Sequence, residues 1–164
     1  MILQSLRLCN FRQYYGDVFL VFGTEKARNI SVIHGANGSG KTTLLNAFTW
    51  GLYADFTPAF ENPDDLLSRK AASLTKKGES AVMSVEVQFS HSGTHYIAKR
   101  KQVYACNNGT ARKTGQELFS VSIRNTDGQT RTVNDPVGLI NRILPKYLYS
   151  YFFFDGERMN RISR

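Results

Sequence analysis

Gly35-Ala36-Asn37-Gly38-Ser39-Gly40-Lys41-Thr42 is the stretch that decides the fold, because it matches the phosphate-binding pattern GxxxxGK[ST] without interruption. The β-branched run just before it, residues 29–33 (NISVI), predicts a strand. The segment from Lys41 to about Tyr53 predicts a helix whose buried face would hold Leu44, Leu45, Phe48 and either Leu52 or Trp50. A strand, a glycine-rich loop and a helix in this order favour nucleotide binding over a chance match in a turn. They predict an α/β fold of the P-loop NTPase class.

The chemistry of the loop predicts ATP and Mg²⁺ as cofactors. Its glycines allow backbone conformations in which successive N–H groups converge on a phosphate, and the helix that follows adds about half a positive charge at its N-terminus. Lys41 is expected to reach the β- and γ-phosphates, and the Thr42 hydroxyl is expected to hold Mg²⁺. The predicted nucleotide-binding residues of this loop are Gly35, Asn37, Gly38, Ser39, Gly40, Lys41, Thr42 and Thr43. His34, directly before the loop, is interpreted as a structural neighbour rather than a catalytic base.

Length and composition predict a single cytosolic domain. The chain has 164 residues, of which 41% are hydrophobic, so it can bury a sizeable core. It has no apolar run of membrane-spanning length and no export signal at Met1, which argues against a membrane partner. Its two cysteines, Cys9 and Cys106, lack metal-type spacing and are expected to be reduced thiols in the cytoplasm.

The charge balance favours a polyanionic partner. The net charge is +8, from 21 basic and 13 acidic residues, which predicts affinity for double-stranded DNA that falls with salt. Many basic residues lie in a β-rich block and, on alternate positions of hairpins, would form one face along a DNA backbone: Lys99, Arg100, Lys101, Arg112, Lys113, Arg124 and Arg131. The best DNA-binding candidates are Lys99, Lys101, Arg112 and Lys113. The alternative is a solvated sheet face in which some of these residues, Arg100 among them, have a structural role.

Four segments follow one another along the chain. Residues 1–53 are expected to hold strands at 1–11 and 18–22, joined by a Tyr14-Tyr15-Gly16 turn, then the phosphate loop and the first helix. Residues 54–80 are expected to be a mobile or partner-dependent connection, with a short helix beginning at 64–67. Residues 81–133 predict an antiparallel meander with strands at 83–89, 96–104, 118–123 and 129–133, and a polar loop at 107–116. Residues 134–164 predict a helix capped by Asn134 or Asp135 and ended by Pro145, then an aromatic run.

A P-loop NTPase also needs a second acidic element, which holds Mg²⁺ and polarises the attacking water. The stretch Tyr151-Phe152-Phe153-Phe154-Asp155-Gly156-Glu157 is the one segment that imitates it. In this interpretation Asp155 is the metal-side carboxylate and Glu157 is the catalytic base. The alternative is an aromatic core strand followed by an ordinary Asp-Gly turn.

Several of these motifs together resemble a known family. Asn10-Phe11-Arg12 after the first strand, the loop 35–43, the hairpin 89–100 and the late FFFDGE stretch are similar to the N-terminal lobe of SMC/RecF-type ATPase heads, which are ABC-class heads split by a coiled coil. The aromatic stretch is most similar to the DndD family of bacterial DNA phosphorothioation systems. The resemblance implies that Arg12 lies near the phosphates. It also implies that Asp155 stands where related heads carry the Gln of the Q-loop.

The resemblance implies a function as well. ATP would close two heads into a homodimer, and hydrolysis would reopen them, on DNA and with other subunits of a DNA-modification or defence complex. The coiled coil and the C-terminal lobe are expected outside these residues, so full ATPase activity is expected only with them. The alternatives are an SMC/RecF-type DNA repair ATPase, a self-contained small NTPase that uses Asp155 and Glu157, or a nucleotide-stabilised DNA-binding scaffold.

Tyr14 or Tyr15 is a further candidate for stacking on the adenine.

Overall fold

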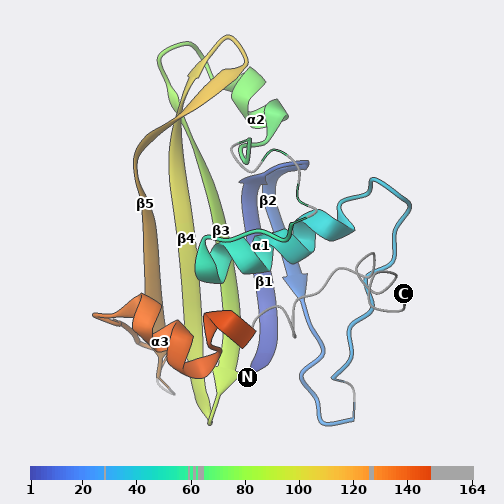
Figure 1. Ribbon diagram of the computed structural model, residues 1–164, viewed down its shortest axis with the longest axis vertical. Coiled ribbons are helices and arrows are strands. Elements are labelled where there is room, and N and C mark those ends of the chain that lie inside the picture. The colour runs from blue at the N-terminus through green and yellow to red at the C-terminus, as the bar shows by residue number, and fades with distance from the viewer. Residues whose placement is uncertain (28, 59, 61, 63–64, 126–127, 149–164) are drawn as a thin grey trace.

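A six-stranded antiparallel sheet forms the body of the molecule, in the strand order β2-β1-β3-β4-β5-β6 (Figure 1). The computed structural model describes residues 1–27, 29–58, 60, 62, 65–125 and 128–148. The strands are β1 (Ile2–Phe11), β2 (Tyr14–Val21), β3 (Ser80–His91), β4 (Thr94–Asn107), β5 (Thr110–Arg124) and β6 (Thr130–Thr132). The helices are α1 (Lys41–Tyr53), α2 (Arg69–Leu74), α3 (Pro136–Ile143) and the 3₁₀ helix η1 (Lys146–Leu148).

The meander forms where alternating apolar residues are joined by tight turns. In β3 every second residue from Ala81 to Phe89 is buried, and β3 pairs with β4 without a break from Ser80↔Ala105 to His91↔Thr94. Ser92 and Gly93 both have positive φ, 49° and 78°, as a two-residue hairpin turn of matching twist requires. These strands confirm the predicted antiparallel block. The expected polar loop at 107–116 is wrong, because β5 already begins at Thr110, after the Asn108-Gly109 turn.

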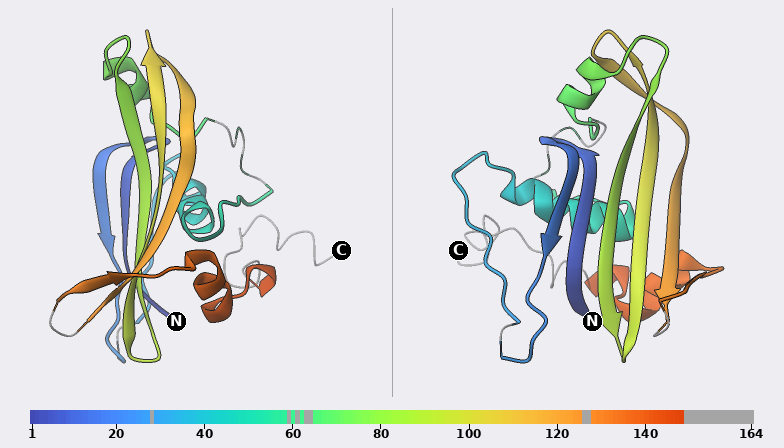
Figure 2. Two further views of the ribbon diagram at one scale, coloured as in Figure 1. Left: turned by 90° about the vertical axis from the view of Figure 1, so that its left-hand side faces the viewer. Right: turned by 180° about the vertical axis from the view of Figure 1, so that it is seen from behind.

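The core lies between the sheet and α1, which has the predicted bounds. Helix α1 crosses β1, β3 and β4, and Figure 2 shows α1 and α3 on the same side of the sheet. Leu44, Phe48, Trp50 and Leu52 are buried, as expected, while Leu45 is half-buried. Gly51 permits the close approach of α1 to β3, because a Cβ on it would lie 2.8 Å from Cγ1 of Val85.

The strand expected at residues 29–33 does not form. Residues 29–35 have no regular structure, and Ile30 and Val32 are 83% and 85% exposed. The physical reason is pairing: a strand gains its stability from neighbours, and no described strand pairs with this segment. The turn expected at Tyr14 to Gly16 is also wrong, because the chain reverses at Arg12-Gln13 and Tyr14 already belongs to β2.

The connection after α1 is tied to the end of β1. Leu66 and Leu67 are buried, and Leu67 forms a bridge with Phe11. The short helix begins at Arg69, later than expected, because residues 66–68 are hydrogen-bonded to that strand end instead.

The helix α3, near the end of the described residues, begins with the cap that the sequence predicts. Asp135 caps α3, as predicted, by accepting a hydrogen bond from the Gly138 amide at 2.8 Å. Residues 149–164, which include Asp155 and Glu157, lie outside the described residues. None of the helices in the described ranges is long and apolar enough to cross a membrane.

Candidate nucleotide-binding site

The phosphate loop leads directly into the N-terminus of α1. Gly38 and Gly40 adopt left-handed conformations, with φ of 78° and 106°, which side-chain-bearing residues rarely adopt. A Cβ on Gly35 would lie 2.5 Å from Oγ of Ser39, so the loop is also tightly closed across its width. Within the loop the Ser39 amide donates to the carbonyl of Ala36 at 3.2 Å. The glycine spacing predicted from the motif therefore has a structural reason at each of these three positions.

The N-terminus of α1 suits an anion. Its N-cap, Gly40, has no side chain to satisfy the first amides, and no acidic residue occupies the first turn. The first N–H groups of a helix lack partners within the helix and carry a partial positive charge. An end without a cap or a compensating carboxylate is suited to bind a phosphate.

Lys41 lies across the loop. Its Nζ donates to the carbonyl oxygens of Gly35 and Ala36, at 2.8 and 2.9 Å. A phosphate would compete with these two neutral oxygens for the ammonium group, and a charged acceptor forms the stronger hydrogen bond. Asn37, Ser39 and Thr42 are exposed at the loop, whereas Thr43 is buried. Thr43 can therefore contribute a backbone amide more readily than its hydroxyl.

The metal side of the site is less complete. Thr42 is the one predicted Mg²⁺ ligand that falls within the described ranges, and Asp155 lies beyond them. No group of three His, Cys, Asp or Glu residues that could hold a metal ion occurs in the described part of the chain. The predicted roles of Asp155 and Glu157 stay predictions.

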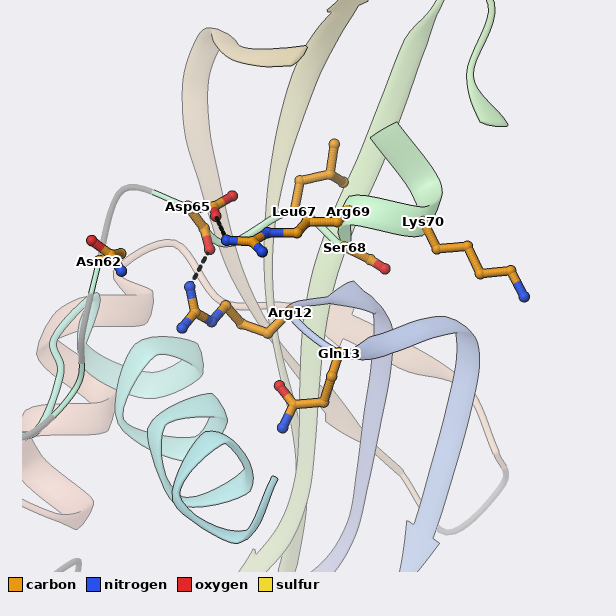
Figure 3. A pocket seen from close by; sticks show the side chains of 8 residues that line it. All are labelled: Arg12, Gln13, Asn62, Asp65, Leu67, Ser68, Arg69 and Lys70. Atoms are coloured by element: carbon orange, nitrogen blue, oxygen red, sulfur yellow. Dashed lines mark hydrogen bonds and ion pairs between the residues drawn. The ribbon is translucent and has the colours of Figure 1, made fainter. Parts of the chain in front are cut away.

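A cationic pocket of about 370 Å³ lies beside the reversal between β1 and β2 (Figure 3). Its lining carries three basic side chains and comes from two segments far apart in sequence: Arg12, Gln13, Asn62, Asp65, Leu67, Ser68, Arg69 and Lys70. Arg12 points into it, but its guanidinium donates to the carbonyl of Asp65 at 2.8 Å and lies over the ring of Phe60, 4.9 Å from its centroid. The Arg12 side chain is thus engaged by the connection that follows α1.

Gln13 and Tyr14 are the residues that join this turn to the phosphate loop. A Cβ on Gly40 would lie 2.2 Å from Nε2 of Gln13 and 2.7 Å from the hydroxyl of Tyr14. The Tyr14 hydroxyl donates to the carbonyl of Gly40 at 3.2 Å, and burial raises the pKa of Tyr14, so the hydroxyl keeps its proton. Sequence reasoning missed both contacts. The available signal was their position just after Asn10-Phe11-Arg12.

The basic residues of the meander do not share one face. In an antiparallel pair, residues directly opposite each other point to the same side of the sheet. Arg112 lies opposite Ala105 and shares the outer face with Lys99 and Lys101, whereas Lys113 lies opposite the buried Tyr104 and belongs to the face that α1 covers. Lys99 is further engaged by Glu86, with Nζ 3.3 Å from the carboxylate.

Arg100 is a structural residue. It is 6% exposed, and it donates to the carbonyls of Gly51 and Leu52, both at 3.3 Å, at the end of α1. Glu117 forms an ion pair with it, and the Phe119 ring centroid lies 4.1 Å from its Cζ. Burial lowers the pKa of Arg100, and the Glu117 carboxylate opposes that shift.

The sheet, the crossing helix and the loop together define a P-loop nucleotide-binding domain with a mostly antiparallel sheet and few helices. Comparison with protein families agrees. The model of the family described as "AAA domain" matches residues 5–160, so the chain belongs to that family.

The relatives carry DNA repair names. The chain is 29% identical over 165 residues to the DNA double-strand break repair Rad50 ATPase of Thermoplasma acidophilum, covering 99% of this chain. It is 31% identical over 137 residues to the DNA replication and repair protein RecF of Carboxydothermus hydrogenoformans, covering 84% of this chain. The chain spans 16% of the length of that Rad50 protein and 34% of that RecF protein. These matches support an SMC/RecF-like ATPase head and do not single out the DndD family.

Proposed function

We propose that this chain is the ATP- and Mg²⁺-binding N-terminal lobe of an SMC-like ATPase head that acts on DNA. The observation that carries the proposal is the N-terminus of α1, which has no side-chain cap. It is preceded by a tight glycine-rich loop, and the ammonium group of Lys41 lies against that loop. In this assignment Lys41 neutralises the γ-phosphate, and the amides from Gly38 to Thr42 hold the phosphates. Thr42 holds Mg²⁺, with Asp155 as its second ligand and Glu157 as a catalytic base.

The proposed cycle needs more than residues 1–164. ATP binding brings two heads together as a homodimer, and hydrolysis separates them, so the chemistry drives a change of conformation. The short span relative to the Rad50 and RecF proteins supports a second lobe elsewhere in the full-length protein. Strands from such a lobe would pair with residues 29–33 and cover the exposed Ile30 and Val32.

Two DNA processes are candidates for this ATPase, namely DNA repair and DNA phosphorothioation or a related defence system. The names of the Rad50 and RecF relatives favour DNA repair, whereas the resemblance of the aromatic Asp-Gly-Glu stretch to the DndD family favours phosphorothioation or another defence system. The sulfur content of DNA from a strain that lacks this gene separates them: loss of phosphorothioate linkages supports modification, and unchanged linkages with sensitivity to strand breaks support repair.

The nucleotide site is tested by Lys41→Ala, with the exposed Lys77→Ala as a matched control for loss of one positive charge. Removing a charged hydrogen-bond donor costs about 1.5–3 kcal/mol, which is roughly a 10- to 150-fold loss of affinity for MgATP. Titration calorimetry measures the affinity of each variant for MgATP. Unchanged affinity in Lys41→Ala would overturn the site assignment.

Turnover separates an ATPase from a scaffold that uses the nucleotide as a structural ligand. The full-length protein should hydrolyse ATP, with a rate that changes when duplex DNA is added. A self-contained NTPase would instead turn over ATP with residues 1–164 alone and lose this activity in Glu157→Gln. Binding without turnover in the full-length protein would support the scaffold.

A further inference from the structure

The turn from Asn10 to Tyr14 is held in an unusual conformation. Asn10 and Arg12 have φ of 51° and 55°, in the left-handed region that residues with side chains rarely occupy. Such conformations persist where the surroundings over-determine them, and they gather at functional sites. The surroundings here include the Asn10 side chain, whose amide donates to the carbonyl of Val82 at 3.0 Å and whose oxygen accepts from the Gly16 amide at 2.9 Å.

The same turn is fixed from its other side by the segment before α2. The Arg12 amide donates to the carbonyl of Leu66 at 2.7 Å, and the Ser68 amide donates to the carbonyl of Asn10 at 2.8 Å. With the Arg12 guanidinium on the carbonyl of Asp65, three hydrogen bonds therefore join the turn to residues 65–68. The turn is a rigid support rather than a free hairpin end.

This support touches the phosphate loop at Gly40. The carbonyl of Gly40 accepts two hydrogen bonds, from the Tyr14 hydroxyl at 3.2 Å and from the Leu44 amide at 2.9 Å. The second bond is the first of helix α1, and the first bond comes from the sheet. The Gln13 amide fills the space on the side of Gly40 where a Cβ would be.

We propose that Tyr14 is a positioning residue for nucleotide binding, which fixes the last peptide of the phosphate loop to the β1–β2 turn. This inference rests on the proposed nucleotide-binding function. A carbonyl held from two directions fixes the orientation of the peptide unit between Gly40 and Lys41. The Lys41 amide belongs to that unit, so it faces the phosphate position before the ligand arrives. Pre-organisation of this kind reduces the ordering cost of binding.

The test is Tyr14→Phe in the full-length protein, because phenylalanine keeps the ring and removes only the hydroxyl. The matched control is Tyr53→Phe at the other end of α1, where the Tyr53 hydroxyl donates to the carbonyl of Leu144 at 2.9 Å. The probe is the non-hydrolysable ATP analogue AMP-PNP with Mg²⁺. One lost neutral hydrogen bond predicts about a fivefold rise in Kd for Tyr14→Phe and none for Tyr53→Phe.

Amide hydrogen exchange without nucleotide supplies a local readout, and Tyr53→Phe controls for any change in global stability. Tyr14→Phe should speed exchange at residues 38–44, whereas Tyr53→Phe should leave these residues unchanged. Equal effects of the two variants on Kd, or no effect of Tyr14→Phe on Kd and exchange, would overturn the positioning role alone. Wild-type protein that fails to bind AMP-PNP would instead overturn the proposed function, and the positioning role with it.

Discussion

Replacing Arg100 by alanine should destabilise the fold and leave DNA binding unchanged. The side chain joins the C-terminal end of α1 to β4 and β5, through two carbonyls of the helix and the carboxylate of Glu117. Breaking a buried ion pair by removing one partner costs about 3–5 kcal/mol. The Glu117 side chain is 31% exposed and can be rehydrated once it loses its partner. We therefore expect the lower end, about 3 kcal/mol.

Urea unfolding of residues 1–164, followed by far-UV circular dichroism, measures this change. Glu117→Gln is the companion variant: it keeps a neutral hydrogen-bond acceptor for Arg100 but removes the counter-charge of the buried guanidinium, and it should cost about 1–3 kcal/mol. A loss below about 1 kcal/mol in Arg100→Ala would refute the structural role, since that range is typical of exposed ion pairs. A flatter salt dependence of DNA binding in Arg100→Ala would refute it too, because a side chain that contacts Gly51 and Leu52 cannot touch a duplex.

Two further predictions concern the loop and the outer face of the sheet. Gly40→Ala should lose more stability than Gly38→Ala: both place a Cβ at positive φ, at about 1–2 kcal/mol, but only at Gly40 does the Cβ also meet other side chains. Comparable unfolding midpoints would contradict the tight contact with the β1–β2 turn. Lys101→Glu should weaken duplex binding and lower its salt slope by about 0.9 per lost phosphate contact, with a smaller effect for Lys99→Glu because Glu86 already engages Lys99. Lys113→Glu, on the opposite face, is the control, and an equal effect there would argue for non-specific attraction.

The sequence predicted what local patterns determine. Helix α1 follows from the motif and from apolar spacing, and the β3–β4 hairpin follows from the alternation on either side of its Ser-Gly turn. Between β4 and β5 the sequence predicted the Asn-Gly turn but not the pairing of the polar residues after it, which were expected to form a loop. The cap of α3 follows from Asp135 before a proline. The interpretation of basic residues was weaker, because charge alone does not tell which face of a strand a side chain occupies. Only the register shows that Lys113 points away from Lys101.

The contacts around Gly40 were beyond sequence reasoning, because they depend on the path of the β1–β2 turn. Positive φ is uncommon for residues other than glycine, although Asn adopts it more often than Arg does, so an extended strand end was the natural expectation at Asn10 and Arg12. Their conformation is imposed by hydrogen bonds to residues 65–68, which lie more than fifty positions away. A phosphate loop is thus predictable from its own eight residues, while the support that orients it is a property of the tertiary structure.

Residues 29–33 also show that tertiary contacts decide the structure, because here a strand is predicted from the sequence and does not form. Their composition is that of a strand, yet Ile30 and Val32 are almost fully exposed, because β propensity reflects packing against neighbours rather than an intrinsic backbone preference. The two side chains are two positions apart, so in an extended chain they would share one face. Covering that face would gain about 1.5–3 kcal/mol for each side chain. This gain is available only to a partner that supplies both a strand edge and an apolar surface, and that is the property we propose for the second lobe of the head.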